Sequence, residues 1–422
     1  MENETLSQKK VQQQLVSGSE AVIKILLQEK VDTIFGYPGG AIMPVYDALH
    51  FYKNQLHHVL GRHEQGCIHA AQGYARVAGK VGVCLATSGP GATNLITGLA
   101  DALIDSTPLV CITGQVHSSL LGTDAFQETD IIGISTSVTK WNCQITEAKD
   151  IPKVLAKAFF IAQSGRPGPV LIDITKDAQF EALDFSYEPF TNIKSYYPKP
   201  KLDLKSIQAA AALINKAKKP LVLIGQGVIL ANAEEELLTF IEKINAPAAW
   251  TLLGVSALAS EHPLNVGMLG MHGNYAPNVK TNECDVLIAV GMRFDDRVTG
   301  DLSRYAKQAK VIRLDIDATE ISKNVHAHVP VLGDAKESLS ALSSLVTSNQ
   351  HPEWLASFEA LNELEHQKVV KDQLFPKEQA LTMAEVVHLT SEAVKHDAVL
   401  VTDVGQHQMV ASRYFKFKQS KS

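Results

Sequence analysis

Short apolar runs alternate with longer amphipathic stretches along most of the chain, and a glycine-containing turn often follows an apolar run. Apolar runs bounded by turn residues are typical of buried strands, and the amphipathic stretches are typical of helices. Strands that alternate with helices in this way pair in parallel, because each helix carries the chain back across the sheet. The sequence therefore predicts doubly wound α/β sheets. Its 422 residues suggest about three domains.

The first βα series is expected over residues 19–185. It follows a polar, Gln-rich stretch, residues 1–18, which has no apolar centre and predicts a disordered tail, not a signal peptide. We expect helices over Ser19–Glu29, Cys67–Gly79 and Ile151–Gln163, a further helix from the turn 88–94 to about Leu103, and strands over Thr33–Gly36, Val81–Thr87, Pro108–Thr113 and Pro169–Ile174.

A Pro- and Lys-rich stretch near residues 191–204 predicts a linker to a second series over 200–347. After it, residues 348–378 predict a charged helical connector, and residues 379–422 predict the start of a third domain. The third domain is expected to be incomplete, because a parallel strand needs a neighbour. We expect strands over Pro220–Ile224, Ala248–Leu252, Val286–Val290, Lys310–Ile316 and Ala398–Asp403, and helices over Glu234–Ile244, Asp334–Leu345, Pro352–Asp372 and Met383–Lys395.

Charge and cysteine content exclude several classes of function. The formal charge is -6 and no basic tract is present, so nucleic acid is not expected as a partner. Five scattered cysteines without a CxxC pair indicate neither a disulfide framework nor a zinc site, which favours the cytoplasm. No run approaches the ~18 apolar residues of a membrane span.

The first series carries candidate site residues at its predicted turns. Glu64 lies between glycines at the start of a helix, near a strand end where ligands collect in open α/β sheets. It could instead be a first-turn acid that interacts with the helix dipole. Pro38, Gly39 and Gly40 allow a close backbone approach, as does the turn 88–94, although both could be tight connections without a ligand.

A polar loop over 122–128 is too polar for the core and too long for a simple connection, and it predicts part of a site lining. Phe126 could supply an apolar wall and Gln127 a neutral donor, and Lys176 follows a strand on the ligand side. In the second series Gly225-Gln226-Gly227 lacks the third glycine of a dinucleotide fingerprint. Polar groups recur after its other strands, over 271–273, 293–297 and 315–317. They could hold phosphates and ribose hydroxyls or form a surface salt-bridge cluster.

Taken in order, these motifs resemble the large catalytic subunit of the acetohydroxyacid synthase (acetolactate synthase) family, which uses thiamine diphosphate. The resemblance covers about Ser19 to Phe417. It rests on the segments 35–40, 62–66, 88–94, 122–128, 270–273, 291–299 and 405–409.

The resemblance implies a pyrimidine-binding domain, a central FAD-binding domain and a diphosphate-binding domain. Glu64 corresponds to the acid that hydrogen-bonds the aminopyrimidine ring and promotes loss of the thiazolium proton. The implied catalytic residues are Glu64, Phe126, Gln127, Lys176 and Arg293. The implied thiamine diphosphate contacts are Pro38, Gly39, Gly40, Glu64, Gly405, Gln406 and His407. The implied FAD contacts are Arg166, Gly225, Gly227, His272, Gly273, Gly291, Arg293, Asp295, Arg297, Asp315, Ile316 and Asp334.

The resemblance also implies a reaction and its partners. Two pyruvates would condense to 2-acetolactate and CO2, or pyruvate and 2-oxobutyrate to 2-aceto-2-hydroxybutyrate, at the first common step of branched-chain amino acid biosynthesis. Thiamine diphosphate, Mg2+ and FAD are the implied cofactors, with the flavin in a structural role. The implied assembly is a cytoplasmic homo-oligomer, a dimer or tetramer with sites built across the dimer, together with a regulatory small subunit.

One departure from the family pattern concerns the C-terminal end. The Gly-Asp-Gly motif that binds the divalent ion is not found after residue 409, and residues 418–422 leave the pattern, so we expect a truncated chain without a metal site of its own. Two other classes stay open. One is another FAD-containing thiamine enzyme, such as a pyruvate oxidase or a glyoxylate carboligase, although the latter lacks the acid at Glu64. The other is a non-catalytic remnant that binds FAD or pairs with full-length subunits.

Overall fold

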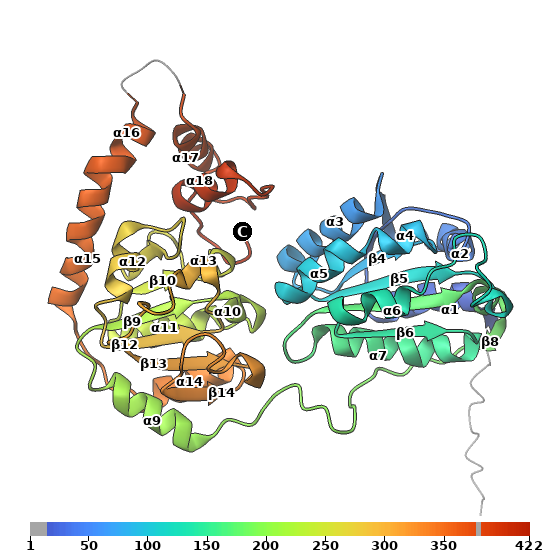
Figure 1. Cartoon of the computed structure of the whole chain (residues 1–422), viewed down its shortest axis with the longest axis horizontal. Helices are drawn as coiled ribbons and strands as arrows, with labels where there is room; N and C mark the ends of the chain where they lie inside the picture. Colours follow the sequence, from blue (N-terminus) through green and yellow to red (C-terminus); the bar gives the residue numbers. More distant parts are fainter. Residues whose placement is uncertain (1–14, 377–380) are drawn as a thin grey trace, which may run out of the picture. The chain divides into compact units, whose positions relative to one another are not determined.

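The computed structural model describes residues 15–376 and 381–422, and the chain divides between Pro198 and Lys199 into two compact units. Each unit is built on one six-stranded sheet with helices on both faces (Figure 1). Neighbouring strands run parallel throughout both sheets. The predicted α/β class with doubly wound parallel sheets is confirmed for these two units.

The sheet of the first unit has the strand order β3-β2-β4-β5-β7-β6. Its strands are β2 (Thr33–Gly36), β3 (His57–Leu60), β4 (Gly82–Ala86), β5 (Leu109–Gln115), β6 (Trp141–Ile145) and β7 (Pro169–Thr175). Its helices are α1 (Gly18–Gln28), α2 (Met43–Tyr52), α3 (Glu64–Ala78), α4 (Pro90–Thr93), α5 (Ile96–Ile104), α6 (Ile131–Ser135), α7 (Ile151–Gln163) and α8 (Lys176–Phe180).

Both faces of this sheet are buried, because alternate side chains of each strand point to opposite sides. Val110 and Ile112 of β5 belong to the core that contains buried residues of α1, α2 and α7. Leu109 and Cys111 of the same strand belong to a second core with buried residues of α3 and α5. The central strands are therefore continuous apolar runs, which explains why the sequence predicts them.

The disordered tail predicted over residues 1–18 is wrong for residues 15–18. Leu15–Ser17 form a short strand, β1, which pairs antiparallel with β8 (Ala182–Asp184), and Gly18 begins α1. Val16 is buried in the core of the unit, so the apolar contact and the strand pairing together order this segment. The rest of the predicted tail, residues 1–14, lies outside the described residues.

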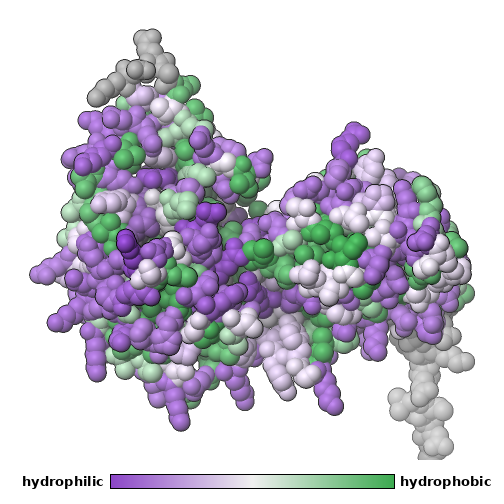
Figure 2. Space-filling view, viewed as in Figure 1, coloured by the Kyte–Doolittle hydropathy of each residue, from purple (hydrophilic) through white to green (hydrophobic). Residues whose placement is uncertain are grey.

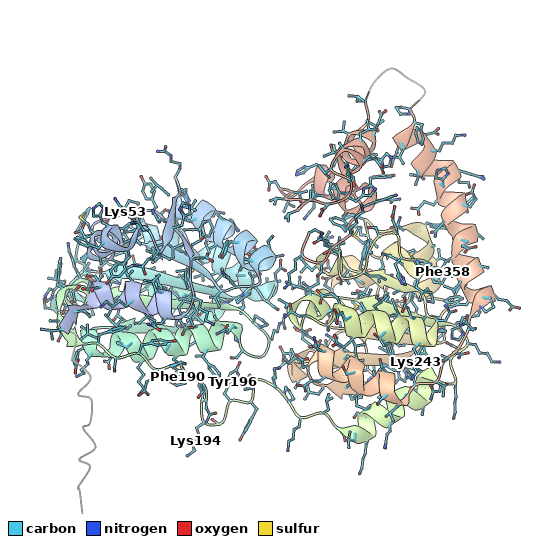
Figure 3. The ribbon with its side chains drawn as sticks, turned by 180° about the vertical axis from the view of Figure 1, so that it is seen from behind. Lys53, Phe190, Lys194, Tyr196, Lys243 and Phe358 are labelled. Atoms are coloured by element: carbon cyan, nitrogen blue, oxygen red, sulfur yellow. The ribbon has the colours of Figure 1, made fainter. Side chains whose placement is uncertain are left out.

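The predicted linker near residues 191–204 contains no helix or strand before α9 (Leu204–Ile214). Its first part packs back on the first unit. The rings of Phe190 and Tyr196 lie 5.9 and 6.3 Å from the ring of Phe160 on α7 (Figure 3), and the Tyr196 hydroxyl donates to the Ser164 carbonyl.

The sheet of the second unit has the order β11-β10-β9-β12-β13-β14. Its strands are β9 (Pro220–Ile224), β10 (Ala248–Trp250), β11 (Asn265–Met268), β12 (Val286–Val290), β13 (Lys310–Asp315) and β14 (Val329–Leu332). Buried residues of α9, α11 (Glu234–Ile244) and α14 (Ala335–Leu345) cover one face. Buried residues of α12 (Tyr275–Thr281) and α15 (Pro352–Glu365) cover the other. Two short helices, α10 (Gln226–Leu230) and α13 (Asp296–Thr299), follow β9 and β12.

The predicted connector is a long helix that packs on the second unit. It begins as α15, continues through a π-helical turn (His366–Val370) and ends as α16 (Lys371–Leu374). Phe358 (Figure 3) and Trp354 are buried with their rings 5.0 Å apart, and the Trp354 indole donates to the Pro220 carbonyl. Two further helices follow, α17 (Met383–Ala393) and α18 (Gln406–Tyr414).

The strand predicted over Ala398–Asp403 does not form. No parallel neighbour is available to it among residues 381–422, so its backbone groups have no ladder to join. Val401 is 84% exposed, and Leu400 makes a backbone hydrogen bond to Ser422 instead. Residues 381–422 belong to the second compact unit, and they form two helices and no strand.

Apolar side chains are concentrated in the cores, and the surface shown in Figure 2 is mainly hydrophilic with separate hydrophobic areas. Within residues 15–376 and 381–422, none of the helices combines the length and the apolar character that a membrane crossing needs. All five cysteines are free thiols, and four of them are buried.

Candidate functional site

The candidate thiamine site lies at the carboxyl edge of the first sheet, between β2 and β4. From β2 the chain first adds β3 on one side and then β4 on the other, so the strand order reverses at this point. A crevice forms where the connections after two neighbouring strands leave in opposite directions, and ligands bind there in open α/β sheets. The loops 37–42 and 87–94 border this crevice.

Glu64 is the first residue of α3 and only 7% exposed. His63 caps the helix by accepting a hydrogen bond from the Gln65 amide. The Asn94 amide nitrogen donates to Glu64 Oε2 at 2.9 Å, which links the helix to the loop after β4. Among the described residues, Glu64 Oε1 has no hydrogen-bond partner. One carboxylate oxygen is therefore fixed by the protein and the other is available to a ligand.

The backbones of the two crevice loops pack closely, and glycine makes this possible. A Cβ on Gly39 would lie 2.6 Å from Thr87 Cβ, and a Cβ on Gly91 would lie 2.7 Å from Thr87 Cγ2 and 3.3 Å from Glu64 Oε1. The Thr87 hydroxyl accepts a hydrogen bond from the Ala41 amide at 3.1 Å, which ties the loops together. Around Gly40, next to Gly39 and Pro38, a Cβ would meet open space. This is the bare backbone that the sequence predicts beside a cofactor.

The loop after β5 brings Phe126 and Gln127 to the same edge of the sheet. Phe126 is 87% exposed, and Gln127 has a positive φ of 58°. The Gln127 carbonyl oxygen lies so close to Gly89, which follows β4, that a Cβ on Gly89 would stand 2.6 Å from it. The loop therefore reaches the border of the crevice that contains Glu64.

Lys176 is the first residue of α8, directly after β7, and its amide donates to the Val116 carbonyl. The next residue, Asp177, accepts hydrogen bonds from the Ser118 amide and hydroxyl. Burial raises the pKa of Asp177, but the Ser118 bonds outweigh it and hold this pKa at about 2. The carboxylate thus stays charged at neutral pH and fixes the start of the loop beside Lys176.

The base of this loop rests on a buried carboxylate, Asp173, in the middle of β7. Asp173 is inaccessible to solvent and accepts hydrogen bonds from Thr113 (2.6 Å), Gln115 (3.1 Å) and Gln144 (2.9 Å). The Gln115 amide also donates to the Thr129 carbonyl. Burial raises the pKa of Asp173, and the three donors oppose this rise. The network joins β5, β6 and β7 to the end of the loop.

Replacing Asp173 by Leu is expected to destabilise the chain by about 3–5 kcal/mol, because it leaves up to three buried donors without an acceptor. The fall would be seen in urea unfolding as a lower midpoint with an unchanged slope. The matched control is Asp184→Leu, since Asp184 is an exposed acid on β8. Equal stability of the two variants would show that the network does not support the sheet.

The sheet of the second unit also has a point where the strand order reverses, and different loops border it. From β9 the chain adds β10 and then β11 on one side, and β12 on the other, so the strand order reverses between β9 and β12. Gly225 and Gly227 follow β9, and Gly291 follows β12 with φ +57°. A Cβ on Gly227 would lie 2.6 Å from the Gly291 Cα, and the Gly227 amide donates to the Gly291 carbonyl at 2.9 Å. Only bare backbone fits at this switch point.

The loops after β11 and β12 meet beside these glycines. The Met271 amide donates to the Arg297 carbonyl at 2.7 Å, and a Cβ on Gly270, which has a φ of 104°, would lie 2.7 Å from the same carbonyl oxygen. His272 and Gly273 complete this turn. Arg293 forms an ion pair with Asp295, which also caps α13 through the Val298 amide. The predicted arginines and acids therefore share one edge of the sheet.

Asp315 and Ile316 follow β13, and Asp334 follows β14. Asp315 accepts from the buried Arg313 and from the Asp317 amide. Burial raises the pKa of Asp315, and these bonds oppose the rise. Asp334 caps α14 by accepting from the amides of Lys336 and Glu337. Asp334 therefore has a structural role as the cap of α14, independent of any contact to a ligand.

Four predicted residues lie elsewhere in their units. Arg166 precedes β7, at the amino end of the strands of the first unit, and its Nε donates to the Ser106 hydroxyl at 2.8 Å. The structure therefore places Arg166 on the edge opposite to the Glu64 crevice. Gln406 and His407, preceded by Gly405, begin α18 in the second unit and are exposed. Within the described residues, no group of three or more His, Cys, Asp or Glu side chains is arranged to hold a metal ion.

Several supporting residues were not predicted from the sequence. Asn94 and Thr87 lie in or next to a predicted motif, but their contacts to Glu64 and Ala41 depend on how two loops meet. Asp173 and Arg313 are buried inside strands. The apolar pattern of such a strand predicts that its residues are buried, but not which partners a charged one has. A charged residue within an otherwise apolar strand is the signal that could have found both.

Two known protein families match the chain, one in each compact unit. Residues 16–134 match the family described as "Thiamine pyrophosphate enzyme, N-terminal TPP binding domain". Residues 207–342 match "Thiamine pyrophosphate enzyme, central domain". The first match covers the Glu64 crevice and the second covers the glycines of the second switch point.

Known relatives define the family more narrowly. The chain is 45% identical over 420 residues to a probable acetolactate synthase large subunit of Methanocaldococcus jannaschii, covering 96% of this chain and 70% of that protein. It is 45% identical over 414 residues to the acetolactate synthase large subunit of Corynebacterium glutamicum, with 96% of this chain and 65% of that protein covered. An acetolactate synthase of Mycobacterium bovis is 46% identical over 416 residues, with 97% and 66% covered. The chain belongs to the acetolactate synthase large subunit family.

Proposed function

We propose that this chain provides the pyrimidine-binding and flavin-binding parts of an acetolactate synthase. The reaction joins two pyruvates into 2-acetolactate and releases CO2. With 2-oxobutyrate as the second substrate, it forms 2-aceto-2-hydroxybutyrate. Support comes from relatives of about 45% identity that carry this name and from the residues that border the two crevices. The observation that carries the proposal is the buried Glu64 carboxylate, whose Oε2 is held by Asn94 and whose Oε1 is open.

Thiamine diphosphate, when bound, supplies the nucleophilic carbon and the electron sink that decarboxylation of a 2-oxo acid needs. Glu64 Oε1 is available to accept a hydrogen bond from the pyrimidine ring and to share its proton. Gly40, where a Cβ would meet open space, leaves bare backbone for the ring to approach, and Pro38 and Gly39 belong to the same turn. The tight contact of Gly39 with Thr87 keeps the border of the crevice in place.

We propose that two exposed residues of the first unit, Phe126 and Gln127, and the half-buried Lys176 bind the 2-oxo acid. Phe126 offers an apolar surface to a methyl group, Gln127 offers a neutral donor, and the Lys176 ammonium offers a charge for the substrate carboxylate. All three follow the carboxyl ends of β5 and β7. On the resemblance alone, Arg293 is proposed as a group near the flavin and the second substrate.

FAD is proposed to bind at the second switch point. At Gly225, Gly227 and Gly291 a Cβ would collide with the backbone of the facing loop, so glycine keeps the two loops close and leaves bare backbone at the switch point where a pyrophosphate would bind. Arg293 and Arg297 would pair with phosphates, and Asp295, Asp315 and Asp334 would accept from hydroxyl groups. His272, Gly273 and Ile316 border the same edge. Arg166 and the segment 405–407 are proposed as flavin and diphosphate contacts, respectively, on the resemblance alone.

The remaining proposals also rest on the family resemblance. Mg2+ is proposed to accompany the cofactor diphosphate, and no residue of this chain is assigned to it. We propose a cytoplasmic homo-oligomer, a dimer or tetramer, that binds a regulatory small subunit.

The flavin proposal can be tested on the 422-residue chain itself. We expect the chain to bind about one FAD, seen as a change in flavin fluorescence, and to leave the flavin oxidised when pyruvate is added. Retention of FAD with reduction by pyruvate would instead indicate an oxidase of the same thiamine enzyme class. Failure to bind FAD at the concentration of the protein would contradict the assignment of the second switch point.

A further inference from the structure

Glu128 folds the loop that presents Phe126 and Gln127. Its carboxylate accepts the Gly122 amide through Oε1 and the Ala125 amide, at 3.1 Å, through Oε2. The hydrogen bond from the Gly122 amide lowers the pKa of Glu128 most, and the amides of Ala125, Thr123 and Asp124 lower it further. A single charged side chain therefore lies in a nest of backbone amides from its own loop.

The backbone of this loop has an unusual conformation that side-chain packing does not hold. Asp124 and Gln127 have φ values of 56° and 58°, which residues other than glycine seldom adopt. Phe126, between them, is 87% exposed, so its own contacts do not fix it. The Glu128 amide closes the turn by donating to the Ala125 carbonyl at 2.9 Å, and the Glu128 carboxylate adds the bond that reaches across the loop to the Gly122 amide.

The loop is anchored on both sides of Glu128. On one side the Gln127 carbonyl packs against the backbone of Gly89 at the crevice. On the other side the Thr129 carbonyl accepts from Gln115, which is bonded to the buried Asp173. Glu128 lies between these two fixed points, so its bonds decide how the intervening residues are held.

We propose that Glu128 is a positioning residue, whose negative charge holds Phe126 and Gln127 in the arrangement that receives the 2-oxo acid. Both of its carboxylate oxygens are engaged by amides, so it is not itself a contact to the substrate. The part that concerns the substrate rests on the proposed function, whereas the folding of the loop by Glu128 does not depend on it.

The first test compares amide hydrogen exchange of residues 120–130 in three forms of the chain. Glu128→Gln keeps the shape but presents an NH2 group to one of the amides. We expect the Gly122 and Ala125 amides to exchange at least tenfold faster in this variant. The control Asp124→Asn removes a charge from the same loop without removing the amide acceptor, and it should exchange as the unchanged chain does. Unchanged exchange in Glu128→Gln would overturn the proposal.

The pH dependence gives a second reading of the same interaction. Because the pKa of Glu128 is lowered in the folded chain, the carboxylate should protect these amides above its usual titration range. The protection should be lost only as the pH falls through the lowered pKa. The Glu128→Gln chain should show no such step. If amide exchange changed with pH by the same amount in the unchanged chain and in Glu128→Gln, the Glu128 charge would not be what protects these amides.

The third test concerns the substrate and uses a form of the protein that produces acetolactate. We expect Glu128→Gln to raise the KM for pyruvate at least fivefold while its melting temperature stays unchanged. If the loop amides of Glu128→Gln exchange faster but its kcat/KM for pyruvate does not change, Glu128 folds the loop but does not position Phe126 and Gln127 for the substrate. That result would contradict the part of the proposal that concerns the substrate. If the unchanged protein yields no acetolactate, the proposed function fails, and the exchange experiment still decides whether Glu128 holds the loop.

Discussion

Replacing Glu64 by Gln is expected to lower kcat for acetolactate formation by about 10²- to 10⁴-fold, the range that a positioned acid or base contributes. Gln has nearly the same shape, and its carbonyl oxygen can still accept the bond from Asn94. What it lacks is a carboxylate that can hold a proton at the open Oε1 position. We therefore expect the melting temperature to change little while turnover falls.

The control for this substitution is Glu147→Gln in the same unit. Glu147 forms an ion pair with Lys149 at the surface, where such pairs contribute little to stability. Both variants would be assayed with thiamine diphosphate, Mg2+, FAD and saturating pyruvate. Comparable turnover in Glu64→Gln and Glu147→Gln would show that Glu64 is a first-turn acid without a catalytic role.

Replacing Gly291 by Ala is expected to destabilise the second unit by about 2–5 kcal/mol and to weaken FAD binding at least tenfold. The new Cβ would lie 2.5 Å from the Gly227 Cα, and the contacting atoms are all backbone. The φ of +57° adds about 1–2 kcal/mol for any residue with a Cβ. Overpacking of this kind costs about 1–3 kcal/mol more.

Gly300→Ala separates the two contributions. Gly300 has nearly the same φ, +55°, but a Cβ there would meet open space. It should cost only the conformational part, about 1–3 kcal/mol for a φ of 55° with a ψ of -124°, and leave flavin binding intact. Urea unfolding and a flavin fluorescence titration measure the two effects. If both variants lose the same stability and the same affinity for FAD, the contact between the two switch-point loops is not important.

The interior strands of both sheets could be predicted from the sequence, and the edge strands could not. All eight interior strands were predicted to within three residues at each end, because they are mainly apolar runs buried on two faces. The four edge strands were missed. β3 contains two histidines, β14 contains a proline and β11 contains a glycine, since an edge strand is buried less completely.

Which residues lie at the switch points could be predicted where a motif is local and not where loops meet. Glu64 and the glycines at 39, 225 and 291 were chosen from short segments, and the structure places each of them at a switch point. The sequence contains no local sign that Asn94 would hold one oxygen of Glu64 and leave the other open. That contact is set by the packing of α3 against the loop after β4.

The strand predicted over Ala398–Asp403 shows why an apolar run is an incomplete signal. Its residues have strand propensity, but a strand in a parallel sheet is stabilised by hydrogen bonds to neighbours far away in the sequence. None is present among residues 381–422, and the segment stays irregular.

The most direct test of the account measures the product formed from pyruvate with thiamine diphosphate, Mg2+ and FAD. It would use a chimaera in which this chain replaces the aligned part of the Methanocaldococcus jannaschii relative, since the chain spans 70% of that protein. We expect one 2-acetolactate and one CO2 for every two pyruvates consumed, and loss of both products in Glu64→Gln. Consumption of pyruvate without acetolactate, or acetolactate formed equally well without the Glu64 carboxylate, would contradict the account.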